Sequence, residues 1–119
     1  MIIRIDPASA VPLFEQIVRA VRSEILGARL AAGDRLPSAR ELATSLEINL
    51  HTVLRAYQDL REEGLIELRR GRGAAIADGA SPHRARLLER VRETVGEARG
   101  LGLTVDELLT LVRTEYGTG

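Results

Sequence analysis

The sequence predicts a mainly α-helical fold with one small β hairpin, which places it in the α+β class. Apolar residues recur every three or four positions in several segments, the spacing that gathers them on one face of a helix. Capping residues and glycines divide these segments into separate helices. Residues 65–76 change to the shorter period of strands, on both sides of a basic turn.

The composition narrows the classes of protein to which the chain can belong. It has 119 residues, of which 45% are hydrophobic and 29% charged, and its formal net charge is zero. That size suits one small domain, or a domain with an appendage. The absence of cysteine excludes disulfides, thiolate metal sites and nucleophilic thiols. Because no segment resembles a membrane span or a secretory signal, we expect a cytoplasmic protein.

The first predicted elements are a short strand over residues 2–5 and an amphipathic helix. Pro12 suits the first turn of that helix, because the amide hydrogen that proline lacks would be unpaired there. The helix is expected to end near Gly27. Its apolar stripe consists of Leu13, Ile17, Val21 and Ile25.

A short second helix is predicted from a capping signal. Ser38 and Glu41 have the spacing at which a side chain and a backbone amide satisfy each other at a helix start. The helix buries Leu42 and Leu46 one turn apart and breaks over residues 47–49.

A third helix is expected between a cap at Asn49 and a left-handed glycine at Gly64. A helical wheel separates an apolar face, expected in the core, from a polar face that is free for binding. We expect the hydroxyl of the buried tyrosine to find a backbone partner. The apolar face holds Val53, Ala56, Tyr57 and Leu60, and the polar face holds His51, Thr52, Arg55, Gln58 and Asp59.

Residues 65–68 and 74–76 predict the two strands of a hairpin whose tip, residues 69–73, is basic. An isolated hairpin is barely stable in water, so this one is expected to pack on the helices. The side chains expected in that contact are Leu65, Ile66, Leu68 and Ile76.

The last part of the chain predicts two further helices. Ser81 and Pro82 open the first, and Thr104 with Glu107 forms a second capping box at the start of the other. Their apolar stripes are narrow and need a partner surface, either in a second copy or on the first helix of the same chain. The residues expected at a dimer interface are Leu88, Val91, Val95, Leu108, Leu109 and Val112.

The order of these elements indicates a winged helix-turn-helix over residues 1–77, followed by a helical dimerisation tail over residues 78–119. In that fold the polar face of the third helix enters a DNA major groove, and the hairpin tip reaches phosphates or the minor groove. Zero net charge argues against general affinity for DNA. Arginines nevertheless gather on the predicted contact elements, as Arg40, Arg55, Arg69, Arg70 and Arg72.

Four motifs within about residues 10–77 resemble the DNA-binding domain of the GntR family of bacterial transcription regulators. They are PLFEQI from Pro12, GDRLPSARELA from Gly33, HTVLRAYQDL from His51 and EGLIELRRGRG from Glu63. The short helical tail resembles the YtrA subfamily, whose members lack a large effector domain and dimerise through such a tail.

The resemblance implies a homodimer, usually a repressor, that binds an inverted-repeat operator, and the subfamily is often associated with transporter operons. We expect no cofactor. Two short helices leave no enclosed pocket within one subunit, so the expected place for a small-molecule effector is a cleft at the dimer interface. Family members contact DNA near the start of the second helix, at the opening of the third helix and at the hairpin tip. The residues at these positions, together with those of the basic turn, are our DNA-binding candidates: Arg40, Asn49, His51, Thr52, Arg55, Arg70, Gly71 and Arg72.

Some positions depart from the family pattern. Glu47 stands where many relatives have glycine, so either it adopts an unfavourable backbone conformation or the turn is built differently. Leu50 and Leu54 replace residues that are more often proline and serine, so the operator of another member is not expected to apply.

Other functions were weighed against DNA binding. The chain has no glycine-rich phosphate loop, and its two histidines lack triad or metal-ligand partners, so we expect neither an enzyme nor a metal site. The alternative to a DNA contact for Arg40 is a surface ion pair with Glu41 or Glu62. The main alternative for the whole chain is a winged helix that binds RNA or a protein.

Overall fold

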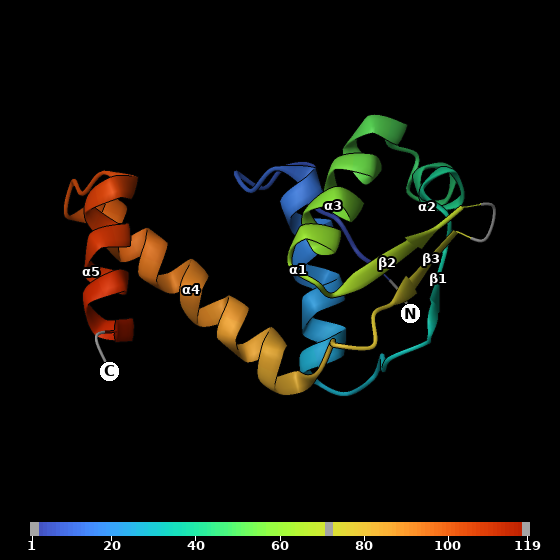
Figure 1. The fold of residues 1–119 in the computed structure, drawn as a ribbon. Coiled ribbons are helices and arrows are strands. Elements are labelled where there is room, and N and C mark those ends of the chain that lie inside the picture. Colours follow the sequence, from blue (N-terminus) through green and yellow to red (C-terminus); the bar gives the residue numbers. More distant parts are fainter. Residues whose placement is uncertain (1–2, 71–72, 118–119) are drawn as a thin grey trace. The chain divides into compact units, whose positions relative to one another are not determined.

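Figure 1 shows the computed structural model, which describes residues 3–70 and 73–117. It is mainly helical with a small antiparallel sheet, as predicted. The chain forms two compact units that divide between Arg86 and Leu87, inside the fourth helix. The elements are α1 (Leu13–Leu26), β1 (Arg35–Leu36), α2 (Ala39–Leu46), α3 (Leu50–Glu62), β2 (Ile66–Arg69), β3 (Gly73–Ile76), α4 (Pro82–Gly100) and α5 (Val105–Gly117).

Three helices and the sheet make up the first unit, and α3 contacts α1, α2 and β2 (Figure 1). The stripe predicted for α1 is confirmed at Ile17, Val21 and Ile25, which are fully buried. Val53 and Leu60 of α3 are fully buried as well. Burial of each such side chain contributes about 1.5–3 kcal/mol before conformational entropy is subtracted. This core fixes the position of α3, whose other face is exposed.

The sheet has the strand order β1-β3-β2. Its hairpin is in the register Ile66 opposite Ile76, which buries both side chains. β1 was not predicted from the sequence; it is a strand of two residues that pairs with β3 through Arg35 opposite Ala75. The turn before β1 contains Gly33 at φ +88°, and the Gly33 amide donates to the Ile76 carbonyl at 2.9 Å.

Two predictions about strands and core are wrong. Residues 3–5 form no strand, and residue 2 lies outside the described residues. The described sheet consists of β1, β3 and β2, so residues 3–5 have no partner strand in it. Just beyond this segment the chain is held by Gln16, whose Oε1 accepts from the Asp6 amide at 2.7 Å and whose Nε2 donates to the Asp6 carbonyl at 3.0 Å. Leu68 was expected in the core but is 43% exposed, because it lies toward the hairpin tip beside an open groove.

Glu63 connects α1 and the start of α4 to the end of α3, through one ion pair and one hydrogen bond. Arg22 of α1 is only 3% exposed and forms an ion pair with Glu63, which follows α3. The Glu63 carbonyl accepts a hydrogen bond from Nε of Arg84, at the start of α4, at 2.9 Å. The predicted cap of α4 is confirmed, because Oγ of Ser81 accepts from the Arg84 amide at 3.1 Å.

The second unit is a helical hairpin of α4 and α5. Its predicted capping box is present, with the Thr104 amide donating to Oε1 of Glu107 at 2.9 Å and the Glu107 amide donating to Oγ1 of Thr104 at 3.2 Å. Ala98 is buried in this unit, whereas α5 has no buried residue. Across the described part of the chain, no helix is both long and apolar enough to cross a membrane.

Candidate nucleic-acid interface

The turn between α2 and α3 determines how the exposed face of α3 is presented. Glu47 adopts φ +56°, so the first of the two predicted alternatives is correct and this residue accepts a left-handed conformation. The next amide, of Ile48, donates to the Ala43 carbonyl at 3.0 Å and closes the end of α2. The two helices are therefore joined by a tight turn, as the helix-turn-helix arrangement requires.

The start of α2 is held against α3 by one buried hydroxyl. Tyr57 is 2% exposed, and its hydroxyl donates to the Pro37 carbonyl at 2.6 Å, as the sequence predicted. Burial, with the charge of Glu41, raises the pKa of Tyr57 far above its usual value, so the hydroxyl stays protonated and can donate. Ser38 caps α2, with its Oγ accepting from the Glu41 amide at 3.1 Å.

The polar face of α3 lies where the helical wheel placed it. His51, Arg55 and Gln58 are exposed, and Thr52 is half-buried. The opposite face, which includes Val53 and the other predicted core residues of α3, is buried. Hydrogen-bonding side chains thus project from the first half of α3, the part of a recognition helix that contacts base edges.

Asn49 has a structural role at this site. Its Oδ1 accepts from the His51 amide at 2.7 Å, which confirms the predicted cap of α3. The same side chain was predicted to contact DNA, and the cap leaves both donors of its amide nitrogen and one lone pair of Oδ1 for that contact.

Arg55 is held by a residue that the sequence analysis did not link to it. Its guanidinium carbon lies 3.7 Å from the centroid of the Phe14 ring, which belongs to α1. Such a cation–π contact at an exposed site contributes about 0.5–1 kcal/mol. The aromatic ring therefore restricts the side-chain conformations of an exposed arginine on α3.

Two elements that contact α3, namely α2 and the hairpin, carry exposed basic side chains. Arg40, in the first turn of α2, is exposed and makes no ion pair with Glu41 or Glu62 within the described residues, contrary to its alternative role. Arg70 is also exposed, at the end of the hairpin strand. Gly71 and Arg72, the other predicted residues of the hairpin tip, lie outside the described residues.

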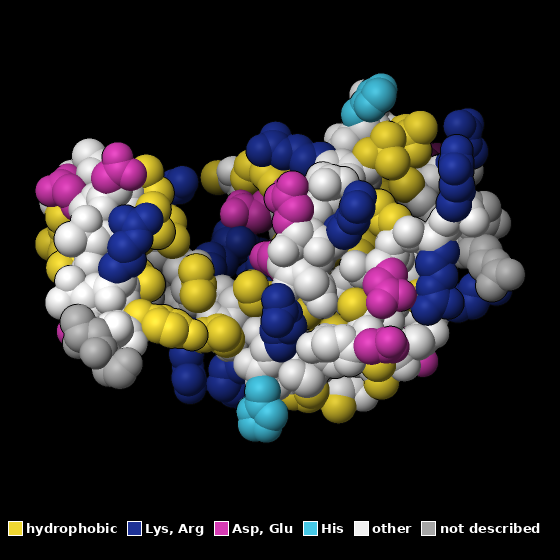
Figure 2. Space-filling model, viewed as in Figure 1, with side chains coloured by type: hydrophobic (Ala, Val, Ile, Leu, Met, Phe, Trp, Pro, Cys, Tyr) yellow, Lys and Arg dark blue, Asp and Glu magenta, His cyan; other side chains and the backbone are white. Residues whose placement is uncertain are grey.

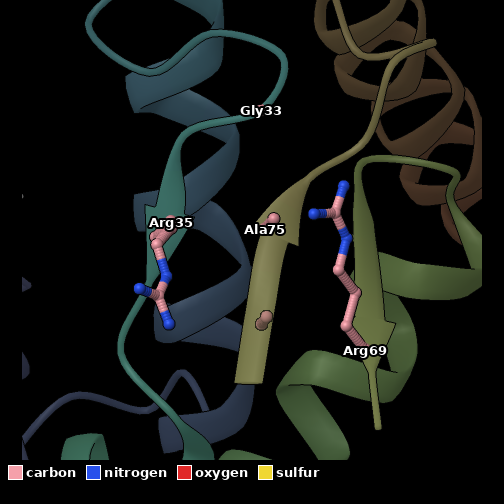
Figure 3. A pocket seen from close by; sticks show the side chains of 5 residues that line it. Gly33, Arg35, Arg69 and Ala75 are labelled. Atoms are coloured by element: carbon pink, nitrogen blue, oxygen red, sulfur yellow. The ribbon is translucent and has the colours of Figure 1, made fainter. Parts of the chain in front are cut away.

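The outer face of the sheet carries an open trough of about 470 Å³. Figure 3 shows Arg35 and Arg69 on either side of Ala75, which forms its floor. Arg69 forms an ion pair with Glu67 at 3.2 Å, which reduces the positive charge of the trough. No group of three histidine, aspartate or glutamate side chains that could hold a metal ion occurs in residues 3–70 and 73–117.

A family model described as bacterial regulatory proteins of the gntR family matches residues 13–76. The chain belongs to the GntR family. This match spans α1 to β3, the helices and strands that present the exposed face of α3. Membership makes the chain a DNA-binding transcription regulator rather than an enzyme.

Two curated GntR relatives match most of the chain. It is 36% identical to the HTH-type transcriptional repressor YtrA of Bacillus subtilis over 89% of this chain and 85% of that protein. It is 35% identical to the HTH-type transcriptional regulator Rv1152 of Mycobacterium tuberculosis over 90% of this chain and 88% of that protein. The similarity therefore extends beyond the family match into the tail.

Two solved GntR structures are similar as well. YtrA from Sulfolobus acidocaldarius aligns with a TM-score of 0.62 and 32% identity over 92% of each chain. The DNA-binding domain of AraR in complex with operator ORX1 aligns with a TM-score of 0.55 and 25% identity, over 62% of this chain and 92% of that one. That second structure is of a domain bound to DNA.

Sequence reasoning missed two residues of this candidate interface. Phe14 was noted only as part of the PLFEQI motif, and no signal in the sequence linked it to Arg55 on α3. Leu54 was noted as a departure from the family, but its 44% exposure on α3 was not predicted. The sequence signal that could have indicated this exposure was the position of Leu54 next to Arg55 on the predicted third helix.

Proposed function

We propose that this regulator is a homodimeric repressor of an inverted-repeat operator, with α3 of each copy in a major groove. The observation that carries the proposal is the exposed polar face at the start of α3, flanked by Arg40 and by the basic hairpin. We infer that the regulator represses transcription because its Bacillus subtilis relative YtrA is named a transcriptional repressor.

The roles of the proposed contacts follow from their chemistry. Arg55 and His51 carry donors that suit guanine or phosphate, and Thr52 can bond to either. Arg40 and Arg70 are proposed to contact phosphates on either side of the groove, which positions α3 without selecting sequence. Contacts by Gly71 and Arg72 remain predictions from the sequence.

The tail is proposed to form the dimer interface. Val91 is 51%, Leu109 39% and Val112 48% exposed, a large fraction for aliphatic side chains. The other three residues predicted for this interface, Leu88, Val95 and Leu108, are half-buried. A second copy that covers these side chains would pair two reading helices, as an operator of two half-sites requires.

Selection of binding sites from a random DNA library tests operator recognition. The expected result is one enriched inverted repeat, with two protected half-sites about one helical turn apart in a footprint. Arg55→Ala should lower affinity by about 5- to 150-fold if it loses a bidentate contact with a base. Arg61→Ala is the matched control, because Arg61 is exposed in the last turn of the same helix. Enrichment of no DNA sequence would favour the RNA-binding or protein-binding alternative.

Sedimentation of the free protein tests the dimer. The intact chain should sediment with twice its own mass, and Leu109→Asp with Val112→Asp should sediment as a monomer. The charged variant should also bind a full operator no more tightly than a single half-site. A monomeric intact chain at operator-binding concentrations would contradict the proposed dimer.

A further inference from the structure

A groove of about 220 Å³ lies between the recognition helix and the hairpin. Ala39 at the start of α2, Leu54 and Tyr57 of α3 and Leu68 of β2 line it. The groove thus opens beside the polar face of α3 and is framed by the three elements proposed to contact DNA.

The exposure of two leucines distinguishes this groove. Among the described residues of the first unit, Leu54 at 44% and Leu68 at 43% are the large hydrophobic side chains left exposed, and both line the groove. A single exposed leucine is ordinary on a protein surface. Two exposed leucines line one groove, in a unit whose other large aliphatic and aromatic side chains are buried or half-buried within the described residues. This arrangement indicates a surface that an apolar group occupies in the bound state.

The surrounding charge favours DNA as the occupant. Arg40 follows Ala39 directly and Arg70 lies two residues beyond Leu68, and both arginines are exposed, so basic residues stand next to two of the residues that line the groove. Figure 2 shows arginine side chains beside hydrophobic ones on the side of the molecule where α2 and the hairpin lie. A second copy of this chain would bring the same positive charges together, whereas the DNA backbone is complementary to them.

The major groove of DNA displays one apolar group, the C5-methyl of thymine. We propose that Leu54 is a specificity-determining residue that contacts this methyl group in each half-site, with Leu68 on the other side of the same groove. The inference rests on the proposed operator binding and adds to it a base type. It also accounts for a leucine at an exposed position of a recognition helix, where a polar side chain would be better solvated.

The test replaces thymines by deoxyuridine in the operator obtained by selection, which removes the methyl group and changes nothing else. Each thymine is replaced symmetrically in both half-sites, and affinity is measured by fluorescence anisotropy. At the thymine that Leu54 contacts, the intact protein should lose affinity by about fourfold for each half-site, because one methyl group is no longer buried there. Replacement in both half-sites should therefore lower affinity by about 15-fold.

Leu54→Ala should bind the thymine-containing and the uracil-containing operators with equal affinity. Its affinity for the uracil-containing operator should equal that of the intact protein. The second of these results shows that the variant is folded. Leu101→Ala is the matched control, because Leu101 is 78% exposed in the turn between α4 and α5, and it should keep the full methyl effect.

Two results would overturn the inference while operator binding stands. One is that no deoxyuridine substitution weakens the intact protein, and the other is that the methyl effect persists unchanged in Leu54→Ala. If selection enriches no sequence at all, the proposed function fails, and the inference that rests on it fails with it.

Discussion

The guanidinium of Arg55 lies over the ring of Phe14, with 3.7 Å between its central carbon and the ring centroid. The two residues come from different helices, α3 and α1. A side chain proposed to contact DNA is therefore held in place by the helix that packs behind the recognition helix. Restricting an arginine before binding reduces the conformational entropy that is lost in the complex.

The first prediction concerns this support. Phe14→Leu should lower operator affinity by about two- to fivefold, because it keeps an apolar side chain but loses the cation–π contact. In an Arg55→Ala background the same substitution should leave affinity unchanged. Fluorescence anisotropy on the four proteins measures the coupling, and equal effects of Phe14→Leu in both backgrounds would contradict a role through Arg55.

Asn49 allows capping and DNA contact to be separated. Asn49→Ala should lower the free energy of unfolding by about 1 kcal/mol, because the His51 amide loses its acceptor. Asn49→Ser should keep most of this stability, because serine is also a good cap. If the amide nitrogen of Asn49 contacts DNA, both variants should bind the operator more weakly. Urea denaturation and operator titration distinguish the two roles, and full affinity of Asn49→Ser would show that capping is its main contribution.

Local signals explain which parts of the fold were predictable. Ser38 and Asn49 each cap a helix with a hydrogen bond that spans two or three residues, so sequence spacing was enough to locate α2 and α3. β1 escaped prediction because a strand of two residues exists only through its pairing with Ala74 and Ala75 of β3. The strand expected over residues 2–5 failed for a related reason, since residues 3–5 have no partner in the described sheet, which consists of β1, β3 and β2.

The part of the candidate interface that lies on α3 alone could be predicted from the sequence. The periodicity of α3 was sufficient to place His51 and Arg55 on the exposed face. The contact of Phe14 with Arg55 depends on how α1 packs against α3, and the groove beside Leu54 depends on where the hairpin lies. Periodicity within one element carries no information on either relationship.

Glu47 provides a prediction about backbone strain. Its φ of +56° lies in the left-handed region, which costs a residue with a Cβ atom about 1 kcal/mol relative to glycine. Glu47→Gly should therefore raise the free energy of unfolding by about 0.5–1 kcal/mol. Glu62→Gly is the matched control, because Glu62 ends α3 in ordinary helical geometry and its replacement should destabilise. Thermal melting shows whether each substitution raises or lowers the melting temperature, and a lower melting temperature for Glu47→Gly would contradict the strain assigned to Glu47.

The capping box of α5 predicts a dependence of stability on pH. The backbone hydrogen bond from Thr104, with a smaller contribution from its side chain, lowers the pKa of Glu107 below its ordinary value of 4.5. A carboxylate whose pKa is lower in the folded state adds stability above the unfolded pKa, and this is lost as pH falls through the folded pKa. The stability difference between the intact protein and Glu107→Gln should thus shrink below about pH 4.5. A difference that is constant from pH 7 to pH 3 would exclude the effect.

The buried pair of Arg22 and Glu63 predicts the largest loss of stability. The Arg22 side chain is 4% exposed, so Glu63→Ala would leave a buried guanidinium without its carboxylate, at a cost of about 3 kcal/mol or more. Adding Arg22→Met should recover most of that loss, because methionine is apolar and of similar length. Arg84→Ala is the control, since Arg84 is exposed and bonds only the Glu63 carbonyl, so less than about 1 kcal/mol should be lost. Urea denaturation measures these three variants and Arg22→Met alone, and additive losses in the double variant would show that the two charges do not depend on each other.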